Sequence, residues 1–224
     1  MSALASAASG TLAEAICVQV RAEILSGARK PQARIRLEDL KTEFQVSWSP
    51  LREALSRLVA EGLIQIDESR GYRVAPVSRA EMADALHMRK RLEAMALRAS
   101  IEKGDDAWEA EVLAAHHRLS KLEAKRGERE ELEDWERWHR TYQEALWRAC
   151  GSPILIQYCT QMSALFARYR KLFLAANPFD ARVGVEHKEI VEAVLARDAD
   201  RACALLEEHI DRTGRNILAG IRED

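Results

Sequence analysis

The chain has 224 residues, of which 47% are hydrophobic and 31% are charged, and its formal net charge is -2. This length favours two compact domains, and only ten Gly and five Pro among many Ala, Leu, Glu and Arg favour helices. A membrane-spanning helix is not expected because the chain has no run of 18 apolar residues. The near-neutral charge excludes binding of nucleic acid by bulk positive charge, so such binding would need a local basic face.

The N-terminal segment and the cysteines indicate a cytoplasmic protein. Residues 1–10, MSALASAASG, lack the basic start and long apolar core of a signal peptide, and we expect them to form a disordered lead-in. No two cysteines form a CxxC pair, and buried, reduced thiols are expected at Cys17, Cys150, Cys159 and Cys203.

The first domain is predicted to span residues 11–77. Apolar residues at every fourth position predict a helix over residues 11–26, and a short second helix is predicted over residues 37–44. A third helix follows, with Ser49 as its N-cap and Pro50 in its first turn, and ends near residue 61. The period then changes to alternation around a turn at residues 67–71, which predicts a β-hairpin.

The second domain is predicted to span residues 78–224 and to contain helices alone. Glycines and an Asn-Pro pair separate six amphipathic segments, near 79–102, 106–126, 128–149, 153–174, 182–196 and 200–219. The apolar stripe of the first segment is read as Leu86, Leu92, Met95 and Ala99. The protein is therefore expected to be mostly α, with an all-α antiparallel helical bundle that could enclose a cavity.

Three helices followed by a hairpin are the arrangement of a winged helix-turn-helix, whose third helix enters the major groove of DNA. On that helix Arg52 would face outward and could offer a forked donor to guanine or phosphate. The alternative for Arg52 is an ion pair with Glu53 or simple solvation. The predicted DNA-binding residues are Trp48, Ser49, Arg52, Ser56, Arg70, Gly71 and Arg73.

These segments also resemble a known family. VSWSPLREAL at residues 46–55, EGL at 61–63 and RGYRV at 70–74 are similar to the DNA-binding signature of the GntR family of bacterial regulators. The resemblance covers residues 11–77 and implies that Arg52 contacts DNA. Trp48 stands where many members have a second DNA-contacting arginine, so the resemblance does not imply which bases are read.

The second domain resembles the FCD effector domain of the fatty-acid-regulator (FadR) subgroup. The resemblance rests on RKRLE at residues 89–93, on residues 135–153 and on EHKEI at 186–190. Three further stretches are most similar to a carbon-starvation-induced branch associated with glutarate and 2-hydroxyglutarate catabolism: SWSPLREALSRLVAEGL, GYRVAPVSR and EKGDDAWEAEVLAA. We expect a homodimeric repressor that leaves a palindromic operator when a small carboxylate binds, with these two acids as the best candidates.

The resemblance also implies a metal site, because many such domains hold a divalent ion between helices. The family's ligand positions fall on His139, Gln143, His187 and His209, with His139 in place of the usual Asp and Gln143 in place of a usual His. Three imidazoles could hold zinc or a similar metal and leave a position open for a carboxylate. Glutamine is an uncommon ligand, and a histidine on a helix is more often a hydrogen-bonded structural residue.

Arg89 is the main candidate for binding the carboxylate effector, because a guanidinium can clamp a carboxylate with two hydrogen bonds. The alternative is an internal ion pair between Arg89 and Glu93. Tyr142 and Arg148 are the further candidates for polar contacts with the effector.

An enzyme is the alternative function, since the same three histidines around a metal could activate water as in a hydrolase. The sequence contains no HExxH, no P-loop, no GxSxG and no nucleophile with a clear base. Catalysis is therefore not expected.

Overall fold

The chain folds into two compact units, Met1–Ser78 and Arg79–Asp224. The structure is a computed structural model that describes residues 12–67, 71–125, 129–174 and 182–221. The lead-in predicted for residues 1–10 lies outside this described part. None of the described helices is both long enough and apolar enough to cross a membrane.

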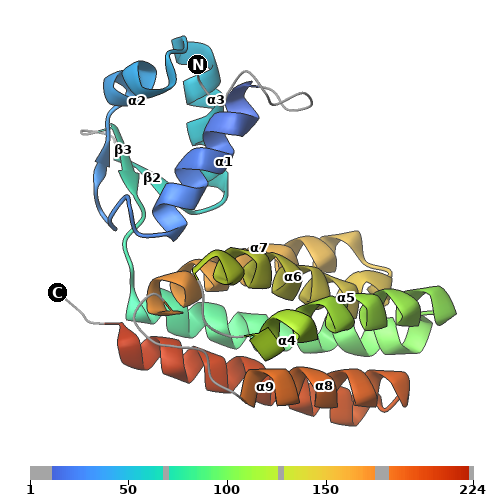
Figure 1. Ribbon diagram of the computed structural model, residues 1–224. Helices are drawn as coiled ribbons and strands as arrows, with labels where there is room; N and C mark the ends of the chain where they lie inside the picture. Colours follow the sequence, from blue (N-terminus) through green and yellow to red (C-terminus); the bar gives the residue numbers. More distant parts are fainter. Residues whose placement is uncertain (1–11, 68–70, 126–128, 175–181, 222–224) are drawn as a thin grey trace. The chain divides into compact units, whose positions relative to one another are not determined.

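The first unit is a winged helix-turn-helix, as predicted. Three helices and a small antiparallel sheet of strand order β1-β3-β2 form it (Figure 1). The predicted hairpin is present, and its register places Ile64 opposite Val74 and Ile66 opposite Tyr72. The elements are α1 (Leu12–Leu25), β1 (Arg34–Ile35), α2 (Leu37–Phe44), α3 (Trp48–Ala60), β2 (Ile64–Asp67) and β3 (Gly71–Val74).

One apolar core holds this unit together. The buried face of α3 consists of Leu51, Ala54, Leu55 and Leu58, each 0% exposed, and it packs against α1 (Figure 1). Burying a leucine side chain contributes about 1.5–3 kcal/mol, so this face fixes how α3 is rotated. The opposite face of α3 is consequently left at the surface.

Two details of this unit differ from the prediction. The third helix begins at Trp48 with Ser47 as its N-cap, so Ser49 lies within the first turn and the predicted cap was wrong. Neither the prediction nor the apolar pattern revealed β1, which pairs with β3 through Arg34 and Ile35. A strand of two residues is too short to show a period of two.

The second unit is an all-α bundle, as predicted. Its helices are separated by short connections, and a single 3-10 turn, Arg148–Cys150, follows α6 in the described part of the chain. The helices are α4 (Arg79–Lys103), α5 (Asp106–Lys125), α6 (Arg129–Trp147), α7 (Pro153–Leu174), α8 (Arg182–Leu195) and α9 (Ala199–Gly220).

The long helix α4 organises the bundle, because it packs against both α7 and α9 (Figure 1). Gly214 lets α9 approach α4 closely, since a Cβ at this position would lie 2.4 Å from Cδ1 of Leu86 on α4. Met95 is 54% exposed, so its place in the predicted apolar stripe was wrong. It lies on the side of α4 opposite the buried residues Glu93 and Leu97.

The four cysteines are free and buried, as their apolar surroundings predict. Burial raises the pKa of the Cys159 thiol to about 12. This thiol is therefore protonated and unreactive at neutral pH.

Candidate functional site

Three buried histidines from three helices meet inside the second unit: His139 of α6, His187 of α8 and His209 of α9. One ring nitrogen of each lies within 4.8 Å of those of the other two, and the ring centroids are 4.7–6.4 Å apart. We call these residues the histidine group. The sequence predicted all of them as ligands, and the structure brings them together as a group that could hold a metal ion.

Two carboxylates set the orientation of two of these rings. Nδ1 of His187 donates to Oε1 of Glu123, and Nδ1 of His209 donates to Oε2 of Glu186, each at 2.7 Å. Arg212 in turn holds Glu186 through Nε at 2.5 Å and Nη2 at 2.6 Å. When the proton of a neutral imidazole is on Nδ1, the lone pair of Nε2 is free to bind a metal ion. Metal-ligating histidines are commonly held in this form by a carboxylate that accepts from the other ring nitrogen.

The histidine group also contains buried nitrogen atoms without partners. Nδ1 of His139 and Nε2 of His187 have no hydrogen-bond partner within the described residues. An unsatisfied buried polar group costs about 1–3 kcal/mol. Coordination of a cation would use such lone pairs, so the residues present fit a metal ion.

Burial favours the neutral form of His139 and of His209. Desolvation, together with the nearby Arg170, lowers the pKa of His139 well below its ordinary value. Desolvation also lowers the pKa of His209 to about 4, although its hydrogen bond to Glu186 opposes the shift. A neutral imidazole is the form that binds a metal ion, so both rings are ready for coordination at neutral pH.

Gln143, the fourth predicted ligand, lies one turn after His139 on α6 and is 2% exposed. Its Oε1 accepts a hydrogen bond from Oγ of Ser163 at 3.0 Å. One lone pair of this oxygen is thus in use, and the other remains.

Arg89 makes the internal ion pair that was the alternative to effector binding. Its Nε donates to Oε1 of Glu93 at 2.7 Å, and its guanidinium lies 4.4 Å from the ring centroid of Phe166. A second buried pair joins Arg170 to Glu136 at 2.8 and 2.5 Å. The interior near the histidine group is therefore lined by paired charges.

The two other predicted effector contacts lie in different environments. Tyr142 is buried with its ring centroid 5.0 Å from that of His187, and its hydroxyl donates to the backbone carbonyl of His187 at 3.2 Å. Arg148 is 62% exposed and pairs with Glu111 at 3.7 Å. The structure thus brings Tyr142 to the histidine group and leaves Arg148 at the surface.

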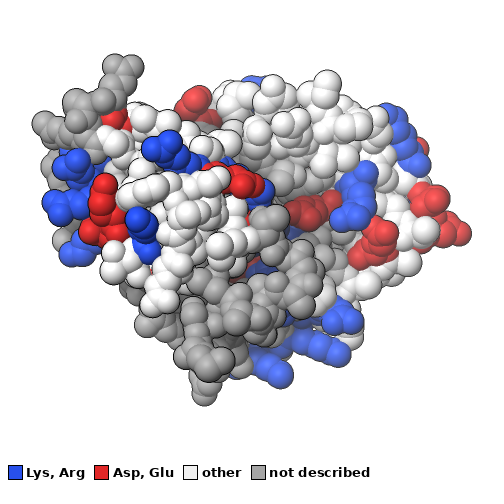
Figure 2. Space-filling model, turned by 90° about the horizontal axis from the view of Figure 1, so that it is seen from above, with Lys and Arg blue, Asp and Glu red and all other residues white. Residues whose placement is uncertain are grey.

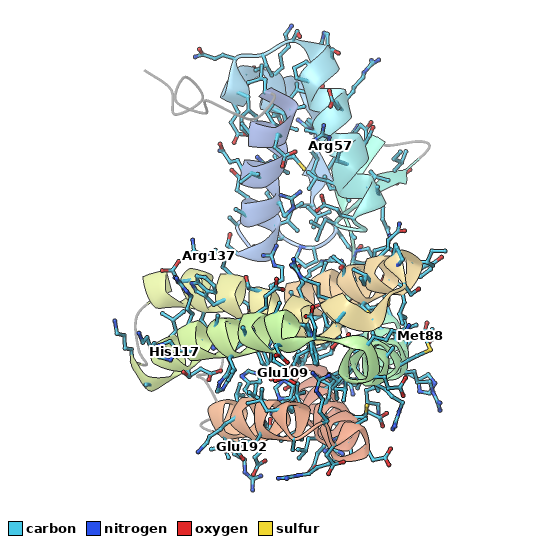
Figure 3. The ribbon with its side chains drawn as sticks, turned by 90° about the vertical axis from the view of Figure 1, so that its right-hand side faces the viewer. Arg57, Met88, Glu109, His117, Arg137 and Glu192 are labelled. Atoms are coloured by element: carbon cyan, nitrogen blue, oxygen red, sulfur yellow. The ribbon has the colours of Figure 1, made fainter. Side chains whose placement is uncertain are left out.

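The exposed face of α3 in the first unit carries the predicted DNA contacts Ser49, Arg52 and Ser56. Arg52 makes no hydrogen bond or ion pair within the described part of the chain. Glu53 instead pairs at 2.7 Å with Arg57, which Figure 3 labels and which also binds Glu14 of α1. The alternative pairing of Arg52 with Glu53 is thus not found, and its guanidinium is available.

The remaining predicted DNA contacts are Trp48 at the start of α3 and residues of the hairpin. Trp48 is 37% exposed, and Nζ of Lys41 lies 4.7 Å from its ring centroid. Gly71 starts β3 with a φ of 80°, and Arg73 lies near Asp67 at 3.5 Å. Arg70 lies outside the described residues.

Charges of both signs occur on the face drawn in Figure 2. Figure 2 shows Lys and Arg interspersed with Asp and Glu over the visible face. Because the formal net charge of the chain is -2, bulk positive charge does not favour DNA binding, and particular side chains such as those of α3 would have to carry it.

Comparison with known proteins decides the family. The model of bacterial regulatory proteins of the gntR family matches residues 12–74, and the FCD domain model matches residues 84–212. The HTH-type transcriptional repressor GlaR of Escherichia coli (strain K12) is 36% identical over 192 residues, which are 84% of this chain and 87% of that protein. This chain belongs to the GntR family and carries an FCD domain.

Further similarities agree with this assignment. The uncharacterized HTH-type transcriptional regulator BphR of Paraburkholderia xenovorans (strain LB400) is 38% identical over 203 residues, which are 90% of this chain and 83% of that protein. The solved structure of E. coli McbR/YncC has the same fold, with a TM-score of 0.74 and 21% identity over 91% of this chain and 95% of that one. The GntR-family chain is a DNA-binding transcription regulator and not an enzyme, so the hydrolase alternative is not supported.

Sequence reasoning about this regulator missed the two carboxylates behind the histidines. Glu186 stands directly before His187, within the segment that carried the resemblance. Glu123 gave no such signal, because it lies 64 residues from His187 and meets it only through the packing of α5 on α8.

Proposed function

We propose that this regulator is a repressor that leaves its operator when a small carboxylate binds at a divalent metal ion held by the histidine group. The observation that carries the proposal is the convergence of His139, His187 and His209, with buried nitrogens of two of them that have no hydrogen-bond partner among the described residues. Zinc or a similar ion suits imidazole ligands. When bound, it would supply an open coordination position for a carboxylate oxygen.

The charges around the histidine group support an anionic ligand. Arg89, Arg170 and Arg212 are paired with Glu93, Glu136 and Glu186, and Glu123 is a further carboxylate bonded to His187. Burial raises the pKa of Glu93, although the charge of Arg89 opposes the shift. A divalent ion would add two positive charges to this buried cluster. An uncompensated charge in the protein interior is costly, so binding of an anion is favoured.

Arg89 is the residue we propose for a second carboxylate of the effector. Its bonds to Glu93 use Nε and Nη2, and a guanidinium has five N–H donors. Desolvation is the main cause of the lowered pKa of His139 and His209, and the charge of Arg89 adds to it. A dicarboxylate could therefore reach from the metal to Arg89, and glutarate and 2-hydroxyglutarate, which come from the family resemblance, are the first acids to test.

The DNA half of the proposal places α3 in the major groove. Arg52 would contact base edges between Ser49 and Ser56, and Gly71 and Arg73 would bring the hairpin to the adjacent backbone. One such unit reads a half-site, so we propose a homodimer on a palindromic operator.

Two helices would transmit the signal. The chain continues from β3 through residues 75–78 into α4, which carries Arg89 and Glu93. Helix α9 carries His209 and packs on α4 where Leu86 meets Gly214. A ligand that prefers one arrangement of α4 and α9 would change the operator affinity, typically by about 1–3 kcal/mol.

A thermal-shift screen with metal analysis tests the sensing half. Zinc-loaded protein should be stabilised by a small dicarboxylate, because a ligand that binds only the folded state raises its stability. Protein that retains no metal after incubation with zinc and dialysis would contradict the metal site. Protein that retains zinc but is stabilised by no dicarboxylate would contradict the effector class.

A further inference from the structure

The first residue of α3, Trp48, is a large aromatic side chain at the protein surface, where its side chain is 37% exposed. Arg52 lies one turn later on the same side of the helix, since residues four apart are neighbours. The buried residues Leu51 and Leu55 follow Trp48 by three and seven positions, so Trp48 lies at the edge of the buried face of α3. Trp48 and Arg52 are nonetheless both exposed and adjacent at the surface.

The side of α3 roughly opposite Trp48 contacts the first helix of the unit through ion pairs. Arg57 pairs with Glu53 and with Glu14 of α1, so that side faces the unit's own first helix. These ion pairs do not involve Trp48.

Lys41 of α2 covers one face of the indole. Its Nζ lies 4.7 Å from the ring centroid, which is a cation–π contact. Part of Trp48 is exposed at the surface, and the ammonium adds a positive charge beside it. This combination of an apolar surface next to a cation suits a base edge that lies close to a phosphate.

We propose that Trp48 helps to select the operator by contacting thymine 5-methyl groups in the major groove. The N-terminal residues of a recognition helix reach base edges, and the thymine methyl group is the apolar feature of those edges. An indole has one donor and no acceptor, so Trp48 cannot form the bidentate pair that Arg52 can form with guanine. The inference rests on the proposed position of α3 in the groove and is independent of the metal and the acid.

Selection of binding sites from a random duplex library tests this directly. The wild-type protein should enrich a site with conserved thymines, and Trp48→Ala should lose the preference at one thymine position per half-site. Replacing that thymine by deoxyuridine removes only the methyl group and should weaken wild-type binding about fourfold, which corresponds to about 0.8 kcal/mol for one buried methylene-sized group. The same replacement should not affect binding by Trp48→Ala.

Two controls keep the outcomes distinct. Trp48→Phe retains an apolar ring and should keep the thymine preference, and deoxyuridine at other thymines should have no effect. Equal base preferences in wild type and Trp48→Ala, or no deoxyuridine effect at any thymine in the wild-type complex, would overturn the role of Trp48. Failure of the wild-type protein to enrich any site would instead overturn the proposed operator binding itself, and with it this inference.

Discussion

Replacement of Glu186 by Gln is a sharp test of whether the histidine group binds a metal. Glu186 accepts from Nδ1 of His209 at 2.7 Å and from Arg212 at 2.5 and 2.6 Å. Burial alone would raise the pKa of this carboxyl, but its bonds to His209 and Arg212 lower it to about 2. Gln keeps an oxygen that can accept from His209 but loses the negative charge behind the ring.

The expected effect follows from the position of Glu186 behind a ligand. Removal of such a carboxylate weakens metal binding about 10- to 100-fold. This is about 1.4–2.8 kcal/mol, and for a chain of this size 1 kcal/mol shifts the Tm by roughly 2–4 °C. At one zinc concentration, the zinc-induced rise in Tm should therefore be smaller in Glu186→Gln than in wild type by roughly 3–11 °C.

The assay pairs thermal unfolding, with and without zinc, with a zinc Kd from competition against a coloured chelator. Glu192→Gln is the matched control, because Glu192 lies on the same helix, is exposed and pairs only loosely with Lys188 at 3.7 Å (Figure 3). It should leave the zinc Kd unchanged. If Glu186→Gln lowers the Tm of the metal-free protein but binds zinc as tightly as wild type, Glu186 has a structural role only and the reasoning is refuted.

The remaining predictions concern the DNA-binding face, the packing of the bundle and its pH dependence. Arg52→Ala should weaken operator binding by about 1–3 kcal/mol in fluorescence anisotropy, and unchanged affinity would exclude a base contact. Gly214→Ala should lower the free energy of unfolding by about 1–3 kcal/mol in urea, because its Cβ would lie 2.4 Å from Leu86, and wild-type stability would show that the helices adjust freely. Burial lowers the pKa of His209 from 6.5 to about 4. Between these two pH values, His209 of the metal-free protein therefore binds more protons in the unfolded state than in the folded state. The free energy of unfolding of the metal-free protein should not depend on His209 above about pH 6.5, and it should fall by up to about 3 kcal/mol as the pH is lowered toward 4. If the His209→Gln variant shows an equal fall, other groups cause the loss of stability.

The secondary structure of the bundle was predictable because its helices are long and their breaks are chemically distinct. The segment predicted at 79–102 is found at Arg79–Lys103, and the one at 182–196 is found at Arg182–Leu195. The first residue of α3 was harder to predict, since Ser47 and Ser49 are both suitable N-cap residues. The two candidates differ by two residues, which is the usual margin in placing a helix end.

The site was predictable only where a local pattern or a resemblance marked it. The positions of the three histidines came from the resemblance, whereas their partner Glu123 depends on the contact between α5 and α8. Arg89 and Glu93 are four residues apart, so their pairing was foreseeable as an alternative, and their burial on α4 to 2% and 0% exposure decides for it. Arg148 looked equally suited to an anion, but the turn after α6 exposes it.

The central claim is that a carboxylate at a metal-loaded histidine group releases this regulator from DNA. The most direct measurement is fluorescence anisotropy of the protein on its selected operator during titration with glutarate or 2-hydroxyglutarate, in zinc-loaded protein, chelator-treated protein and His187→Ala. We predict that one of these acids weakens operator binding about 5- to 150-fold in the zinc-loaded protein alone. Operator affinity that neither acid changes, or that changes equally without zinc and without His187, would contradict the account.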